Sequence, residues 1–192
     1  MTSPNAAVMD FLLSRRSVPA KTLTGPYPDR DQLRPILTAA ARSPDHGKLE
    51  PWRFIVLEKP ALERLSTRIA ALGPVLGIEP EKIEKSRRTY ADAGLAVVVV
   101  SSPKPSEKVP EIEQVYSAGA VCLALTNAAL ASGWGANWLS GWASFDRSFA
   151  EQDLGLAPAE NIAGIIHIGT PKYDTPDRPR PDLDAITVWV SE

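Results

Sequence analysis

The spacing of apolar and polar positions predicts helices that alternate with short strands. From Asp29 to about Arg42, apolar side chains recur on one helical face, and Asp29 with Gln32 has the spacing of a capping box. Residues 52–57 and 95–100 are short runs of aromatic or β-branched residues. Such runs are typical of core strands, so we expect these two segments in a sheet.

Weaker patterns complete the expected order of elements. A Ser3-Pro4 cap predicts an N-terminal helix, residues 61–71 and 81–90 read as further helices, and Ser144 is expected to cap a short helix that ends near Gly155. Residues 161–169 read as a last core strand that contains His167, which we expect to be a hydrogen-bonded core residue. Together these elements predict a domain that combines helices with a sheet of core strands.

The longest uncharged helical pattern runs from about Glu111 to Ser132 and loses its charges after Glu113. A domain of 192 residues rarely buries such a helix on every side. We therefore expect a second subunit to cover part of it. Residues 186–190 at the end of the chain predict a strand that reaches across to the partner sheet.

Composition limits the class of protein. With 44% hydrophobic residues, residues 1–192 are expected to form a single domain with its own core. A net charge of -2 predicts no general attraction to nucleic acid or to an anionic membrane. Polar residues and glycines interrupt the apolar stretch 114–145, so no membrane span is expected. The single cysteine, Cys122, lies among apolar neighbours and predicts buried packing in a reducing, cytoplasmic environment.

Two segments in the first third of the chain carry candidate chemistry. Arg15-Arg16-Ser17 follows the first helix and has the donors that a phosphate prefers, although a solvated helix end also fits the triplet. Residues 43–51 join a helix to a strand and include His46, two prolines and a glycine. This segment is either a ligand-holding loop or an ordinary polar connection.

Two later segments carry further candidates. Residues 133–142 combine glycines, which allow close backbone approach, with tryptophans, which offer flat apolar walls or aromatic core packing. The proline-rich tail brings Arg178 or Arg180 within reach of an anion. The chain has no Gly-x-Gly-x-x-Gly, no Gly-x-Ser-x-Gly and no cluster of cysteine and histidine with metal-ligand spacing, so a Rossmann cofactor site, a hydrolase and a metal site are not indicated.

These motifs, taken in order, resemble the FMN-dependent nitroreductase family. They are Arg15-Arg16-Ser17, Arg42-Ser43-Pro44-Asp45-His46 leading into Glu50-Pro51-Trp52-Arg53-Phe54, Gly133-Trp134-Gly135 with Trp138, and Gly169-Thr170-Pro171 before the basic tail. The chain is most similar to a small bacterial branch with Pro-Asp-His in the first loop. The resemblance implies an α+β fold with a mostly antiparallel sheet flanked by helices. It also implies a homodimer with one FMN at each of two sites across the interface.

The resemblance also implies cofactor contacts. Arg15 and Ser17, with Arg16 adjoining, match the positions that hold the FMN phosphate and ribityl chain, and the basic tail adds Arg178 or Arg180. Further contacts are implied at Arg42, His46, Trp138, Leu139 and Ser140, and a nicotinamide nucleotide is implied at residues 128–133.

The chain departs from the family pattern at several of these positions. Pro19 stands where many members have a basic residue near N1 and O2 of the flavin, and Leu139 replaces another basic residue. Lys48 stands in place of a common asparagine, and Glu50 in place of a glutamine. Our hypothesis is that Lys48 supplies the positive charge that Pro19 cannot.

The implied activity is oxidoreduction. NADH or NADPH would reduce FMN, and a nitroaromatic, a quinone or a similar electron-poor acceptor would then bind in its place, in a ping-pong cycle. The flavin N5 carries the hydride, so no catalytic side chain is expected. The alternative is a flavin-binding or storage protein without turnover, or one subunit of a mixed dimer.

Overall fold

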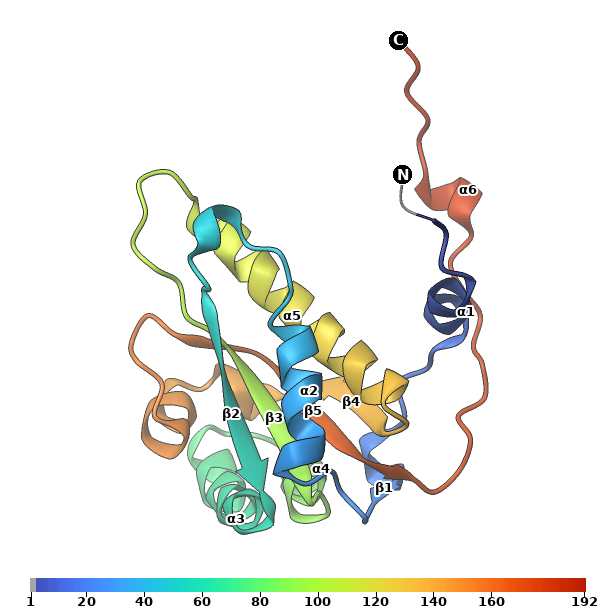
Figure 1. Ribbon diagram of the computed structural model, residues 1–192. Helices are drawn as coiled ribbons and strands as arrows, with labels where there is room; N and C mark the ends of the chain where they lie inside the picture. Colours follow the sequence, from blue (N-terminus) through green and yellow to red (C-terminus); the bar gives the residue numbers. More distant parts are fainter. Residues whose placement is uncertain (1–2) are drawn as a thin grey trace.

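The computed structural model describes residues 3–192 and is built around an antiparallel sheet (Figure 1). The strands are β1 (Leu23–Thr24), β2 (Trp52–Glu58), β3 (Leu95–Ser101), β4 (Gly135–Leu139) and β5 (Asn161–Pro171). Their order is β1-β5-β3-β2, and β4 also pairs with β5. Each pairing is antiparallel, which confirms the predicted sheet type.

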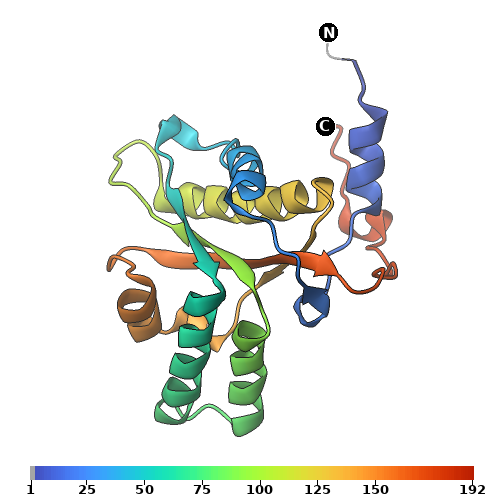
Figure 2. The ribbon, with the colours of Figure 1, turned by 60° about the horizontal axis from the view of Figure 1, so that its bottom comes forward.

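Helices cover both faces of the sheet. They are α1 (Ala6–Ser14), α2 (Arg30–Ala40), α3 (Lys59–Val75), α4 (Pro80–Ala91), α5 (Glu111–Ala131) and α6 (Leu183–Ile186), with shorter helical turns η1 (Ala20–Thr22), η2 (His46–Lys48), η3 (Trp142–Phe145) and η4 (Phe149–Asp153). Figure 2 shows α2 and α5 on one face and α3 with α4 on the other. The fold is therefore α+β, in three layers.

The valine run of β3 explains why the sheet sits at the centre of the core. Val97 and Val99 pack toward α2 and α5, whereas Val98 and Val100 pack toward α3 and α4, and all four side chains are fully buried. A strand that is buried on both faces needs apolar residues at every position. The prediction of a central strand at residues 95–100 is confirmed.

Local signals placed most element boundaries correctly. The capping box of α2 is present: the Gln32 amide donates to Asp29 Oδ1 at 2.8 Å, and the Asp29 amide donates to Gln32 Oε1 at 3.1 Å. α2 ends at Ala40, close to the predicted end near Arg42. The Arg42 and Ser43 amides bond to carbonyls three residues back, so the chain tightens there.

Both predicted serine caps are wrong. The α1 cap is Asn5, whose side chain accepts from the Val8 amide at 3.2 Å. Ser144 lies inside η3, and the following turn is capped by Asp146, which accepts from the Phe149 amide at 2.8 Å. In both places a longer side chain, which lies nearer to the helix, accepts the hydrogen bond from the free backbone amide of the first turn.

In the single chain the predicted C-terminal strand does not form, and its pairing with a partner sheet stays a prediction. α6 ends at Ile186, and residues 187–192 form no strand. The tail runs along α1 and away from the sheet (Figure 1), so it meets no sheet edge that could supply backbone hydrogen bonds. Val188, Trp189 and Val190 are between 81% and 90% exposed.

α5 is buried on one side only. Val121, Cys122 and Leu125 pack on the sheet, whereas Tyr116 is 68% exposed and Leu123 is 48% exposed. Within residues 3–192, α5 is the one helix long and apolar enough to cross a bilayer by composition, and 44% of its apolar window is buried in this fold. The prediction of buried packing for Cys122 is confirmed, and burial raises the pKa of its thiol to about 12.

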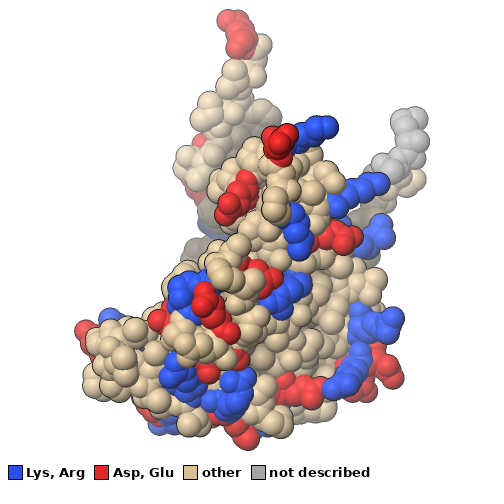
Figure 3. All heavy atoms as spheres, turned by 90° about the vertical axis from the view of Figure 1, so that its left-hand side faces the viewer, with Lys and Arg blue, Asp and Glu red and all other residues tan. Residues whose placement is uncertain are grey.

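A partly buried ion pair joins the start of β2 to the loop before β5. Arg53 donates to both carboxylate oxygens of Glu160 at 2.7 Å, and the Ala157 amide donates to Glu160 at 2.9 Å. Hydrogen bonding from Arg53 lowers the pKa of Glu160 to about 2. Figure 3 shows the side of the molecule opposite α1, where acidic and basic side chains are intermixed. Opposite charges are therefore close enough on this surface to form ion pairs.

We expect Glu160→Gln to lower the free energy of unfolding at pH 7 by about 2 kcal/mol, because it weakens a charged bidentate pair. The folded-state pKa of Glu160 lies below its unfolded value, so its contribution is complete above about pH 4.5 and is lost as the pH falls toward 2. Urea unfolding at several pH values measures both effects. Glu63→Gln, which breaks an exposed pair with Lys59, is the control and should change stability by less than about 0.5 kcal/mol.

Candidate functional site

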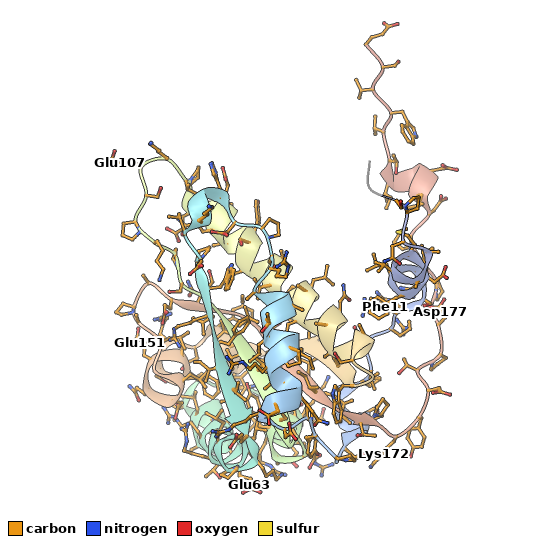
Figure 4. All side chains as sticks on the ribbon, in the orientation of Figure 1. Phe11, Glu63, Glu107, Glu151, Lys172 and Asp177 are labelled. Carbon is orange, nitrogen blue, oxygen red and sulfur yellow. The ribbon has the colours of Figure 1, made fainter. Side chains whose placement is uncertain are left out.

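The segment after α1 and the C-terminal tail meet in a cluster of arginines. Arg15 Nη2 donates to Ser17 Oγ at 3.0 Å, and Arg16 Nε donates to the carbonyl oxygen of Pro176 at 3.1 Å. Asp177 accepts from Arg180 at 2.7 Å and lies 3.8 Å from Arg16. Figure 4 shows Asp177 beside Phe11 of α1. The fold thus brings together predicted site residues that are about 160 positions apart in the sequence.

This arginine cluster is short of negative charge. Burial lowers the pKa of Arg15, and the positive charges of Arg180, Arg16 and Arg178 lower it further. Arg15 Nε is buried, and no hydrogen-bond partner for it exists within residues 3–192. Asp177 is the carboxylate that offsets part of the charge. A buried donor among like charges fits an anion such as a phosphate.

The arginine segment is held against β4. The Val18 amide donates to the Ala136 carbonyl at 2.9 Å, and the Asn137 side chain donates to the Val18 carbonyl at 2.7 Å. Because these bonds tie residues 15–18 to the middle of β4, the arginine cluster has a fixed position relative to the end of that strand.

A cavity of about 440 Å³ opens where β4 ends. It is lined by Lys82, Lys85, Ser86, Thr89, Tyr90, Leu139, Ser140, Gly141, Trp142, Ala143, Ser144, Ile165 and His167. Two of the predicted site residues, Leu139 and Ser140, therefore belong to it. Trp138 does not, because its indole packs across β5 over Gly164, a position at which a Cβ would collide with it.

The contribution of α4 to this cavity was not predicted. Lys82, Lys85, Ser86 and Thr89 have the spacing i, i+3, i+4, i+7, which places them on one side of the helix. That polar stripe is the signal in the sequence, but a stripe of this kind usually faces solvent. Its role as a cavity wall follows from the packing of α4 beside the end of β4.

His167 departs from expectation in one respect. It is 2% exposed, as expected for a core residue, but its Nδ1 has no hydrogen-bond partner in the described part of the chain. Trp142 Nε1, on the same cavity, is likewise buried without a partner among the described residues. Burial lowers the pKa of His167 to about 4, so its imidazole is neutral at pH 7.

The predicted loop contacts lie elsewhere. Gly47, Lys48 and Glu50 have φ angles of 75°, 55° and 47°, so this loop contains three residues in the left-handed region, two of which are not glycine. His46 Nδ1 lies 2.8 Å from Glu113 Oε2 on the first turn of α5. Such a strained and tethered backbone is typical of functional loops.

Ser117 of α5 anchors the same loop by a relay of hydrogen bonds. Trp52 Nε1 donates to Ser117 Oγ at 3.1 Å, and Ser117 Oγ donates to the Pro44 carbonyl at 2.9 Å. In Figures 1 and 2 this loop, which includes η2 and leads into β2, lies on the far side of the molecule from α1. Within one chain, Arg42, His46 and Lys48 therefore do not join the arginine cluster or the cavity.

The segment implied for a nicotinamide nucleotide is partly buried at its start and exposed from Ala131 to Gly133. Residues 128–133 form the last turn of α5 and its C-cap, with Ala129 fully buried and Ser132 Oγ bonded to the Ala128 carbonyl at 2.8 Å. The cavity beside β4 is lined by other segments. As for metals, residues 3–192 contain no group of three or more histidine, cysteine or acidic side chains that could hold an ion.

Comparisons with known proteins identify the class of protein. The Nitroreductase family profile matches residues 12–170. YdjA of Escherichia coli K12, provisionally named an NAD(P)H nitroreductase, is 35% identical over 164 residues, which cover 85% of this chain and 88% of that protein. The chain therefore belongs to the Nitroreductase family.

Solved structures show the same fold. The crystal structure of a nitroreductase-like family protein from Bacillus cereus has a TM-score of 0.79 at 21% identity and covers 99% of this chain and 98% of that one. A Desulfovibrio desulfuricans protein, crystallised in complex with FMN and provisionally named a nitroreductase, has a TM-score of 0.75 at 21% identity, with coverage of 98% and 99%. The predicted fold class is confirmed.

We expect millimolar inorganic phosphate to raise the melting temperature of the protein by several degrees more than chloride at equal ionic strength, because the anion binds the arginine cluster of the folded state. Arg15→Met should remove at least half of this phosphate-specific increase and should not lower the melting temperature without phosphate. Differential scanning calorimetry measures both. Arg34→Met, on the exposed surface of α2, is the control and should keep the phosphate effect.

Proposed function

We propose that this protein is an FMN-dependent oxidoreductase that uses NADH or NADPH to reduce nitroaromatics, quinones or similar electron-poor acceptors. The observation that carries the proposal is the arginine cluster with its partnerless Arg15 Nε, fixed beside a cavity at the end of β4. The name of YdjA supports the nucleotide, and the Desulfovibrio desulfuricans complex supports FMN. A cytoplasmic location is part of the same proposal.

The two parts of the site suit the two ends of FMN. Arg15, Arg16, Ser17, Arg178 and Arg180 would hold the phosphate. The cavity would hold the ring system, since it combines apolar and aromatic walls with polar groups that lack partners. From Asn137 to Ser140 the chain advances about 10 Å, which leaves room for a ribityl chain between the two parts. When bound, FMN would supply hydride acceptance and donation, so the protein needs no nucleophile.

A homodimer would complete this site. Tyr116 and Leu123 on α5, Leu13 on α1 and Trp189 in the tail are large apolar side chains between 48% and 90% exposed. A surface of this kind favours a second copy of the chain. The 43–51 loop is hydrogen-bonded to α5 through Glu113 and Ser117. A two-fold dimer that packs α5 against α5 would therefore place Arg42, His46 and Lys48 of one copy near the cavity of the other. The tail could then also pair with the second sheet.

The source of positive charge beside the flavin is part of this proposal. Lys48 of the second copy remains our first candidate to replace the basic residue missing at Pro19. The cavity offers a second candidate, Lys85, which forms no ion pair with any residue between 3 and 192, whereas Lys82 pairs with Glu79 at 2.9 Å. In either case the cation would favour a negatively charged reduced flavin.

We expect the purified protein, reconstituted with FMN, to be yellow, to bleach when NADH or NADPH is added without oxygen, and to regain its colour with a quinone. Steady-state rates at several acceptor concentrations should give the parallel double-reciprocal lines of a ping-pong cycle. Bound FMN that neither nucleotide reduces would instead favour a flavin-binding or storage role. If the protein binds neither FMN nor reduced FMN, the proposed function is wrong.

Mixed dimers test the shared site. Arg15→Met removes the phosphate end of a site, and the double variant His46→Gln/Lys48→Gln removes the loop end. Each variant alone should bind FMN at least about tenfold more weakly, because charged contacts are lost. After the two are unfolded and refolded together, about a quarter of the sites should bind like wild type, since half of the dimers then carry one intact site.

Fluorescence titration of FMN measures the recovered fraction, and each variant refolded alone is the control. A mixture without any recovery would contradict a site shared between copies. Lys48→Gln alone separates the two candidate cations: if FMN affinity and flavin potential are unchanged in this variant, Lys48 does not supply the charge, and Lys85→Gln is the next test.

A further inference from the structure

Two buried nitrogen atoms without hydrogen-bond partners belong to residues that line the cavity beside β4. They are Nδ1 of His167, from the middle of β5, and Nε1 of Trp142, from η3. Neither has a partner within residues 3–192, and both residues line the cavity. The resemblance to the family implied neither residue as a contact.

A buried polar group that lacks a partner is costly and uncommon. Each one destabilises a folded protein, and most such groups in native proteins are satisfied by a hydrogen-bond partner. Two of them on one cavity therefore point to a molecule that supplies the missing partners. The cavity volume of about 440 Å³ lies within the range of small-molecule sites.

The surroundings of His167 define its chemistry. The Tyr90 ring stands edge-on to the imidazole, at 82° with 6.2 Å between ring centroids, and limits its orientation. Burial keeps the imidazole neutral, so one ring nitrogen donates and the other accepts. The Trp142 indole only donates. Together they fit a planar ring that carries acceptor atoms and an N–H.

We propose that His167 and Trp142 form a hydrogen-bonding pair for the isoalloxazine ring of bound FMN, with His167 as a positioning residue. This inference rests on the proposed function and adds to it a contact between β5 and the ring. Leu139 and Ile165 supply apolar surface beside the pair, and the arginine cluster holds the other end of the cofactor.

The test uses the opposite effects expected without and with FMN. Trp142→Phe and His167→Leu each remove a partnerless polar atom and keep most of the packing volume. Without FMN, both variants should be at least as stable as wild type. With FMN, each should bind about tenfold more weakly, because a hydrogen bond to the ring is lost, and the visible spectrum of the bound flavin should shift.

Matched variants separate positioning from packing. His167→Asn keeps a polar side chain and should retain more FMN affinity than His167→Leu. Tyr27→Phe removes a polar atom from a partly buried aromatic residue on the α2 and α5 side of the sheet, and should leave FMN affinity unchanged. Fluorescence titration of FMN and calorimetric unfolding with and without FMN give the readouts.

The remaining outcomes overturn the inference. If Trp142→Phe and His167→Leu bind FMN like wild type, the two nitrogen atoms are satisfied by water or by neighbouring groups. If both variants are less stable without FMN and bind it with unchanged affinity, the pair has only a structural role. If wild type itself does not bind FMN, the proposed function fails together with the inference, which distinguishes this result from the other two.

Discussion

Backbone pairing along β5 fixes the candidate site in position relative to the rest of the sheet. This strand pairs with β1, β3 and β4 over the residues from Asn161 to Pro171. Its pairing with β4 places Leu139 opposite Ile165, at the mouth of the cavity, and aligns Asn137 with His167. Since Asn137 also holds Val18, the same strand pair fixes the direction in which the arginine segment leaves α1.

The site stores unfavourable electrostatics that a ligand could relieve. Like charges surround Arg15, and nitrogen atoms of Trp142 and His167 lack partners among the described residues. Strain of this kind persists only where the rest of the fold compensates for it. Here the compensation comes from the valines of the fully buried strand β3 and from the Arg53–Glu160 pair that joins β2 to the loop before β5.

The outer face of α5 exposes apolar surface that the single chain does not cover. Large apolar side chains remain exposed there, on α1 and in the tail, and the 43–51 loop is tethered to the same helix through Ser117 and Glu113. A second copy on this face would bury apolar surface and bring a loop to each cavity in a single step. Binding of a cofactor and association of subunits would then stabilise one another.

The sequence by itself determined the features that depend on neighbouring residues. The Asp29–Gln32 capping box, the valine strand β3, the buried Cys122 and the boundaries of α4 follow from local spacing, and all are present in the structure. The arginine triplet was also recognised locally as a candidate anion site. The basic residues Arg178 and Arg180 of the tail were predicted from the sequence to reach an anion, and the structure brings the tail and the triplet together.

Only the tertiary structure decided what depends on distant packing. The polar stripe of α4 reads as a solvent-facing surface until the helix is placed beside the end of β4, and His167 reads as a satisfied core residue until its surroundings show no partner for Nδ1 within residues 3–192. The tail has the composition of a strand but meets no sheet edge in one chain. Hydrogen bonds and charges are satisfied by groups far away in sequence, and local spacing carries no information about where those groups lie.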